Sequence, residues 1–218
     1  RIRMKLLLAI MLLLPMLSSC DKGLPETDFS YKVLQEIDNP IILDHVSLLS
    51  EEGMGKLTRD IISHLEENQV MKIHPLLGAF FNPAKRGFNI NVIIESNGGY
   101  AGIAKGLIGM LSSFKRAGGI EVTCYVNTAQ SAAFTVMLGI CDKKIGIGNV
   151  TLMQHRAHYS GIGYTSGTLL TDMELAKIEA DVVKVNINEW LKITRDSYED
   201  HAFTKKEIEK YKLLDKVL

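Results

Sequence analysis

The sequence predicts an α/β fold with a mainly parallel sheet, and three observations support this. Apolar segments of strand length alternate with segments of helical periodicity through most of the chain beyond residue 40. The run Ile90-Asn91-Val92-Ile93-Ile94 is rich in β-branched residues and is typical of a strand buried on both faces. The chain has 218 residues, of which 46% are hydrophobic, enough for one domain with a substantial core. Repeated strand–helix units imply right-handed crossovers and therefore parallel strands.

The expected elements follow from apolar spacing and from residues that begin or end helices. Residues 40–43 form a short strand, and residues 51–68 form a helix for which Ser50 is a suitable N-cap. Residues 69–87 are irregular and are expected to be an insertion or a surface loop. The other expected strands are 90–94, 120–126, 144–147 and 151–154, and the other expected helices are 101–116, one that follows the small residues 128–133 and ends near 139, 171–194, and one that begins at 204.

Two capping boxes predict where the last two helices begin. Thr171 and Glu174 have the spacing of such a box, and the helix that follows is expected to run to about Thr194. Thr204 and Glu207 have the same spacing and predict the start of the last helix.

The charge balance and the absence of ligand-binding motifs argue against three classes of function. The chain has 25 Lys+Arg and 25 Asp+Glu, so it lacks the basic surplus that is usual in nucleic-acid-binding proteins. It has no His/Cys cluster with the spacing of a zinc site and no nucleotide-binding motif. We therefore expect no metal, no other cofactor and no nucleic-acid partner.

The N-terminus has the features of an export signal. Lys5 precedes the apolar run Leu6–Leu14, which is too short to span a bilayer and suits the hydrophobic region of a signal peptide. Leu17-Ser18-Ser19-Cys20 resembles a bacterial lipobox, which implies acylation of Cys20 and a stable membrane anchor. The alternative is an ordinary signal peptide with an incidental cysteine.

These features predict three regions and a location. Residues 1–19 are expected to be a lipoprotein signal peptide, residues 20–40 a lipid-anchored tether, and residues 41–218 the folded domain. The domain is expected in the cell envelope, anchored to a membrane on its periplasmic or extracellular side. Export permits a disulfide between Cys124 and Cys141, but both lie in apolar segments, and two buried thiols are an equally good interpretation.

Two segments combine small residues with the junction of a predicted strand and helix. Gly98-Gly99 ends a strand and precedes a helix, where glycine permits close approach of a ligand and free N–H groups favour an anion. Ser131 follows a strand and opens a helix among small neighbours, an exposed position for a nucleophile. A serine needs a base, and taken alone this residue is an ordinary helix cap.

A histidine and an aspartate could activate that serine. His155 ends a predicted strand, and a neutral imidazole is the usual base for a serine hydroxyl, although His158 and His201 are competing candidates. Asp200 precedes the last helix and could orient the imidazole. No single one of these residues is specific, but their order along the chain is informative.

With these residues in this order, residues 41–218 resemble the proteolytic subunit of the Clp protease (ClpP), a family within the ClpP/crotonase fold. The stretch 91–99, which ends Glu-Ser-Asn-Gly-Gly, is similar to the family's strand that ends in Ser-Pro-Gly-Gly. The stretch 146–155 is similar to the segment that ends in the catalytic histidine, and the stretch 200–215 to the segment that begins with the triad aspartate.

The resemblance implies a serine-type endopeptidase of repeated β-β-α units with a mainly parallel sheet and a protruding handle helix at 172–194. Ser131 would be the nucleophile, His155 the base and Asp200 the residue that orients it. The N–H groups of Gly99 and Ala132 would form the oxyanion hole.

The family also implies partners. Its handle helix mediates assembly, so a homo-oligomeric ring is expected. Substrate adds as a strand beside a segment that corresponds to 157–167, for which a flexible loop is the alternative interpretation. The Clp subunit works with a cytoplasmic unfoldase that an exported protein would lack, so peptides or unfolded protein segments are the expected substrates.

Departures from the family pattern keep other functions open. When Phe134 is aligned without a gap, Gln130 rather than Ser131 occupies the nucleophile position. Ser131-Ala132-Ala133-Phe134 instead matches the spacing of Ser-Gly-Gly-Tyr in signal peptide peptidase A, which uses a lysine base. A catalytically inactive peptide-binding or scaffolding protein with Gln130 in that position is the main alternative. An acyl-CoA enzyme of the crotonase type is a weaker one.

Overall fold

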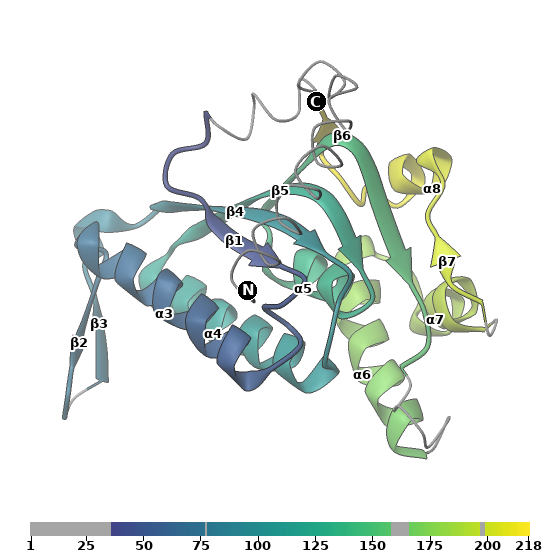
Figure 1. The fold of residues 1–218 in the computed structure, drawn as a ribbon, viewed down its shortest axis with the longest axis horizontal. Helices are drawn as coiled ribbons and strands as arrows, with labels where there is room; N and C mark the ends of the chain where they lie inside the picture. The colour runs from purple at the N-terminus through teal and green to yellow at the C-terminus, as the bar shows by residue number, and fades with distance from the viewer. Residues whose placement is uncertain (1–35, 77, 158–165, 197–198) are drawn as a thin grey trace, which may run out of the picture. The chain divides into compact units, whose positions relative to one another are not determined.

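A mainly parallel sheet with helices packed on it dominates the computed structural model (Figure 1), which describes residues 36–76, 78–157, 166–196 and 199–218. Residues 37–218 form one compact unit. The expected signal peptide, the acylated cysteine and most of the tether lie outside the described residues. No helix in the described part of the chain is both long and apolar enough to cross a membrane.

The order of elements confirms the predicted alternation of strands and helices. In chain order they are β1 (Ile41–Asp44), α3 (Glu51–Glu67), β2 (Met71–His74), β3 (Gly78–Phe81), the short 3-10 helix η2 (Pro83–Lys85), β4 (Asn89–Ser96), α4 (Ala101–Gly118), β5 (Glu121–Gln130), α5 (Ala132–Ile140), β6 (Lys143–Gln154), α6 (Ser166–Val183), α7 (Ile187–Arg195), β7 (His201–Ala202), α8 (Lys205–Lys210) and β8 (Lys216–Val217).

The sheet has the order β1-β4-β5-β6-β7, and β8 also pairs with β6. The strands β1, β4, β5, β6 and β8 pair in parallel, whereas β7 pairs with β6 antiparallel. The α/β class and the mainly parallel sheet are therefore confirmed. Because carboxyl ends of parallel strands lie at one edge, the loops after β4, β5 and β6 share that edge.

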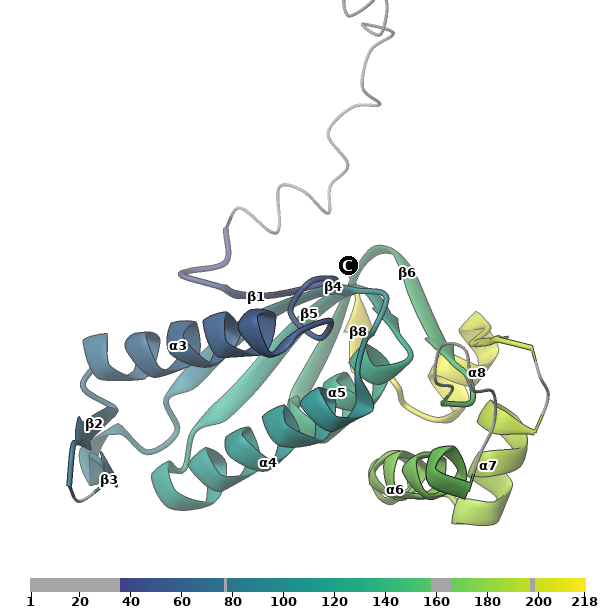
Figure 2. The ribbon, with the colours of Figure 1, turned by 60° about the horizontal axis from the view of Figure 1, so that its bottom comes forward.

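The core lies between this sheet and the helices α3, α4 and α5, which pack on one face of it (Figures 1 and 2). Burial alternates along β4, where Val92 and Ile94 are buried but Ile93 is only half-buried. The prediction that this strand is buried on both faces is therefore wrong. Its β-branched residues suit a pleated strand, but only every second one faces the helices.

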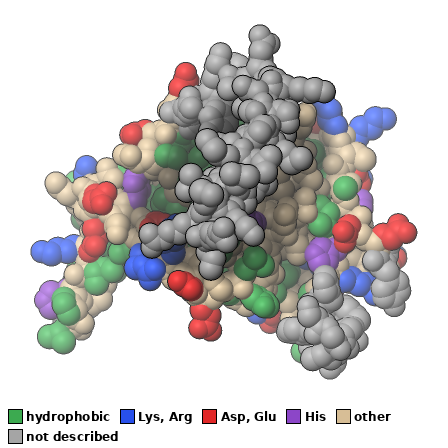
Figure 3. Space-filling model, viewed as in Figure 1, with side chains coloured by type: hydrophobic (Ala, Val, Ile, Leu, Met, Phe, Trp, Pro, Cys, Tyr) green, Lys and Arg blue, Asp and Glu red, His purple; other side chains and the backbone are tan. Residues whose placement is uncertain are grey.

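Residues 69–87 are more ordered than the expected loop, because β2 and β3 form an antiparallel hairpin. The strands are too short to produce a clear alternating pattern. Figure 3 shows hydrophobic side chains on this hairpin, among which Ile73, Leu76 and Phe80 are exposed. Phe81 turns back to the core and contacts Phe114.

The segment expected to be one handle helix consists of two helices. It begins at Ser166, before the predicted capping box at Thr171, so that box lies inside α6 and does not begin it. Lys184 then adopts a φ of 59°, and Val185 N donates to Ala180 O at 3.2 Å, an arrangement that ends a helix. Asn186 caps α7. A left-handed residue other than glycine leaves no clear signal in a sequence.

Other expectations need smaller changes. The two short strands at 144–147 and 151–154 are one strand, β6, in which Gly148 has a φ of 62°. Ser50 caps α3, and the Thr204–Glu207 capping box is complete, as predicted.

The question left open for the two cysteines of the domain is answered by the structure. Cys124 in β5 and Cys141 after α5 form a disulfide with a Cα–Cα distance of 5.7 Å. The bond joins β5 to the end of α5 and closes a loop that contains Ser131.

Candidate active site

Ser131 occupies the single-residue turn between β5 and α5. Its backbone has φ 52° and ψ −126°, a conformation that costs a non-glycine residue about 1–3 kcal/mol. The turn is held because Ser131 N donates to Met153 O at 2.9 Å, while Ser131 O accepts from Phe134 N at 3.0 Å. The side chain is half-buried and lies at the N-terminus of a helix of nine residues, where the helix dipole favours negative charge.

The glycine pair after β4 packs directly against this turn. A Cβ atom on Gly98 would lie 2.7 Å from both Gln130 O and the Cβ of Ser131, and Gly98 has a φ of 99°. A Cβ on Gly99 would lie 2.1 Å from Leu48 O. No residue with a side chain fits either position, which explains both glycines. Of the two, Gly98 is the closer contact of Ser131.

His155 directly follows β6 and lies two residues beyond Met153, whose carbonyl holds Ser131. Its side chain is half-buried, and Nδ1 lies 2.7 Å from the carbonyl oxygen of Arg156. A carbonyl oxygen can only accept, so Nδ1 carries the hydrogen in this contact. In the neutral imidazole Nε2 then carries the lone pair, which is the state of a general base.

Asp200 immediately precedes β7, which pairs with the end of β6. In the antiparallel pairing of β6 and β7, Met153 faces Ala202 and Gln154 faces His201. His155 and Asp200 are the next residues beyond these two pairs, each one position past the paired end of its strand. The Asp200 side chain is exposed to solvent.

The histidines that compete with His155 differ in their surroundings. The ring of His201 packs edge-on against Phe203 at 4.8 Å, and its Nε2 lies 3.1 Å from Glu207 Oε1, an ion pair when protonated. His158 lies outside the described residues, as does most of the expected substrate segment 157–167.

The structure thus brings the predicted residues to one edge of the sheet. Ser131, His155 and Asp200 follow or flank β5, β6 and β7, three neighbouring strands. Ala132 is the first residue of α5, and the first N–H groups of a helix lack intrahelical acceptors. The edge therefore combines a hydroxyl, an imidazole, a carboxylate and the first backbone N–H groups of a helix.

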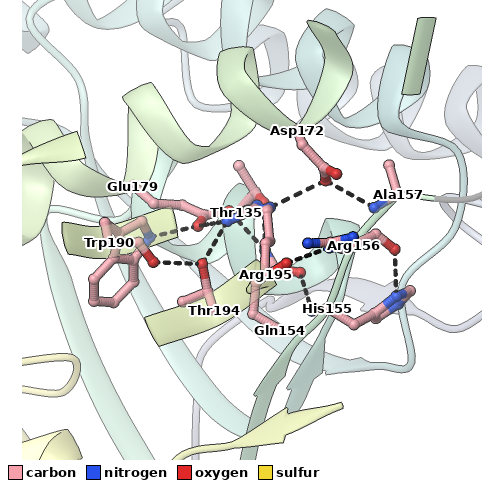
Figure 4. A network of polar contacts seen from close by, with 10 residues as sticks. All are labelled: Thr135, Gln154, His155, Arg156, Ala157, Asp172, Glu179, Trp190, Thr194 and Arg195. Carbon is pink, nitrogen blue, oxygen red and sulfur yellow. Dashed lines mark hydrogen bonds and ion pairs between the residues drawn. The ribbon is translucent and has the colours of Figure 1, made fainter. Parts of the chain in front are cut away.

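A buried polar network behind this edge was missed in the sequence. Figure 4 shows it between β6, α5, α6 and α7, with Asp172, Glu179 and Arg195 at its centre. Burial lowers the pKa of Arg195, but the charges of Glu179 and Asp172 outweigh this and raise it above its ordinary value.

A signal for this network was present in the sequence. Asp172 and Glu179 lie seven residues apart, on the face of α6 that also carries Leu175, Ala176 and Ala180, and all five side chains are buried. Acidic residues at core positions of a helix indicate a buried positive partner. Within the described residues there is no group of three or more His, Cys, Asp or Glu that could hold a metal ion.

Comparison with known proteins bears on the fold. No protein-family model matches the chain, and no match was found among curated proteins. A solved structure described as a peptidase from Plasmodium falciparum is similar, with a TM-score of 0.56 and 13% sequence identity. The similarity covers 81% of this chain and 94% of that one. The chain therefore shares the overall fold of a known peptidase structure.

Proposed function

We propose that this chain is a ClpP-like serine endopeptidase that cleaves peptides or unfolded protein segments in the cell envelope. The observation that carries the proposal is the turn at Ser131, where a strained backbone (φ 52°) presents a hydroxyl between a strand and a helix N-terminus. Nucleophilic serines of hydrolases on other folds occupy turns of this kind. The fold shared with a solved structure described as a peptidase gives further support.

The proposed mechanism assigns one role to each group. Ser131 Oγ attacks the scissile carbonyl carbon while Nε2 of His155 accepts its proton and later gives it to the leaving amine. Asp200 stabilises the imidazolium. The N–H groups of Gly99 and Ala132 donate to the oxyanion of the tetrahedral intermediate. Water then releases the acyl group by the same steps.

The proposed location and assembly have separate support. The disulfide between Cys124 and Cys141 suits an oxidising compartment, which agrees with export and anchoring through Cys20. Leu169, Leu170 and Met173 at the start of α6 are exposed apolar side chains, which supports self-association through this helix. Together with the resemblance to ClpP, these exposed side chains lead us to propose a homo-oligomeric ring.

The first test is labelling of the full chain in detergent with a fluorophosphonate, followed by mass mapping of the adduct. An adduct on Ser131 that is absent in Ser131→Ala and at least about 100-fold slower to form in His155→Ala is expected. A folded protein without an adduct would contradict the proposal and favour the inactive form with Gln130 in the nucleophile position. Acyl-CoA binding by such a protein would instead indicate a crotonase-type enzyme.

Substitution of Gly98 provides a matched pair. In Gly98→Ala the new Cβ would meet Gln130 O and Ser131 Cβ at 2.7 Å, so labelling of Ser131 should slow at least about tenfold. Gly102→Ala, in α4, is the control because nothing lies within 4 Å of its added Cβ. Equal labelling of both variants would count against the assigned geometry.

A further inference from the structure

Three charged side chains are buried together behind the proposed active site. The exposed fractions of Asp172, Glu179 and Arg195 are 1%, 0% and 3%. Arg195 Nε lies 3.1 Å from Asp172 Oδ1, and its two terminal nitrogens lie 2.9 and 2.8 Å from the two oxygens of Glu179. Desolvation makes such a cluster costly, so burial by itself is a poor reason for its presence.

The cluster holds the chain on both sides of His155. Before it, Gln154 Nε2 donates to Glu179 Oε1 at 2.6 Å, while Gln154 Oε1 accepts from the N–H of His155 at 3.0 Å. After it, Ala157 N donates to Asp172 Oδ1 at 2.7 Å (Figure 4). The backbone that carries the proposed base is therefore fixed by two hydrogen-bond chains to the two carboxylates.

The same cluster reaches the helix that carries Ser131. Thr135 Oγ1 donates to Glu179 Oε1 at 2.6 Å, and Gln154 Nε2 donates to Thr135 Oγ1 at 3.1 Å. Thr135 lies in the first turn of α5, and its N–H donates to Ser131 O. One carboxylate therefore connects the elements that present the proposed nucleophile and the proposed base.

A third connection reaches the end of α7. The guanidinium of Arg156 donates to the carbonyl oxygens of Arg195 and Asp196, which end α7 shortly before Asp200. Arg156 thus ties the backbone at the end of α7 to the segment after β6, while the Arg195 side chain holds the two carboxylates.

We propose that Arg195, Glu179 and Asp172 form a positioning centre that holds the segments of Ser131 and His155 in register. The inference rests on the proposed function and adds residues that touch neither substrate nor reacting atoms. A buried polar network whose hydrogen bonds are all made rigidifies the segments that it joins and specifies one arrangement of them. Because a misplacement of about 1 Å can cost about 100-fold in rate, we expect this rigidity to affect the rate of the reaction at Ser131.

A pair of substitutions at Asp172 tests this role. Asp172→Ala removes the acceptor for the Ala157 amide, whereas Asp172→Asn retains an oxygen there. In Asp172→Ala, the maximal rate of fluorophosphonate labelling of Ser131 should fall about 10–100-fold with little change in the half-saturating concentration. Asp172→Asn should recover most of the rate. The control is Glu174→Ala, an exposed carboxylate on the same helix.

Amide hydrogen exchange supplies a second readout. The amides of His155 and Ala157 should exchange faster in Asp172→Ala than in the wild type, and Asp172→Asn should restore protection. A labelling rate in Asp172→Ala equal to that of the wild type would overturn the positioning role and leave the proposed function intact. Slow labelling with unchanged exchange at both amides would also overturn it.

Two further results complete the test. An unlabelled wild type would reject the proposed function and, with it, the positioning role. If Asp172→Ala does not fold, Arg195→Lys tests the positioning role in its place. Lysine keeps the charge but lacks the planar guanidinium that reaches both carboxylates. Its labelling rate should fall about tenfold, and an unchanged rate would overturn the proposal.

Discussion

The two ends of the sheet are packed by different chemistry. Around β1, β4, α3 and α4 the buried side chains are almost all aliphatic, as with Leu57, Ile94 and Leu107. Around β6, α6 and α7 the core includes ions and hydrogen-bonding groups. The buried polar side chains of this second region are Thr135, Lys144, Gln154, Asp172, Glu179, Thr194 and Arg195.

This difference agrees with the position of the proposed active site at one end of the sheet. The aliphatic end needs only close packing, which many combinations of side chains can provide. The polar end lies behind Ser131 and His155, where orientation matters as much as stability. Among the described residues, buried polar side chains are therefore concentrated where β6, α6 and α7 pack together.

Glu179→Ala should produce the largest loss of stability. It leaves Arg195 with one buried ionic partner and removes an acceptor of Thr135, Gln154 and Trp190, so a loss of about 3–5 kcal/mol is expected. Urea unfolding measures this loss. The control is Glu174→Ala, which removes an exposed carboxylate on the same helix and should lower the free energy of unfolding by less than about 1 kcal/mol. Equal losses in the two variants would remove the distinction between buried and exposed carboxylates.

Leu107→Ala tests the aliphatic end. Leu107 is 1% exposed, and its truncation should cost about 2–5 kcal/mol through lost burial and a cavity. The maximal labelling rate of Ser131 should stay within about twofold of the wild type at temperatures where the variant is folded, because no polar contact of the site is touched. A rate loss as large as that of Asp172→Ala would show that both ends position the site.

Removal of the disulfide should have an intermediate effect. The bond spans 17 residues, and the double variant Cys124→Ala/Cys141→Ala should lose about 3 kcal/mol of unfolding free energy. A reducing agent should lower the unfolding free energy of the wild type by a similar amount and leave that of the variant unchanged. A wild type that is insensitive to reduction would indicate that the bond is absent in solution.

The capping box of α8 should have the smallest effect, because its polar groups are exposed. Thr204→Ala should cost about 1 kcal/mol at neutral pH. Burial raises the pKa of Glu207, but hydrogen bonds from the Thr204 hydroxyl and N–H and the charge of His201 outweigh this and lower it.

The pH dependence of this contribution has a definite sign. A depressed pKa in the folded state stabilises the protein above the unfolded-state pKa of Glu207, and the contribution disappears as pH falls through the folded-state pKa. The difference between wild type and Thr204→Ala in urea unfolding should therefore shrink in acid. A constant difference would assign the effect to the hydroxyl cap alone.

Much of the architecture was predictable because it depends on local patterns. Apolar spacing located β4 and α4, and residue type and spacing located the caps at Ser50 and Thr204. Periodicity and capping both involve residues that are near in sequence. The positive φ values at Ser131 and Lys184 were not predictable, because neighbouring segments impose them. The break between α6 and α7 and the strained turn both escaped detection for this reason.

The α/β class, the alternation of strands and helices, and the candidates Ser131, His155 and Asp200 were all predictable from the amino-acid sequence. The three-dimensional fold was needed to show that these three share one edge of the sheet, that Cys124 and Cys141 are bonded, and that Asp172, Glu179 and Arg195 meet in the core. The physical reason is distance along the chain. Strand pairing and burial join residues far apart in sequence, and the partner of a buried charge is chosen by the fold.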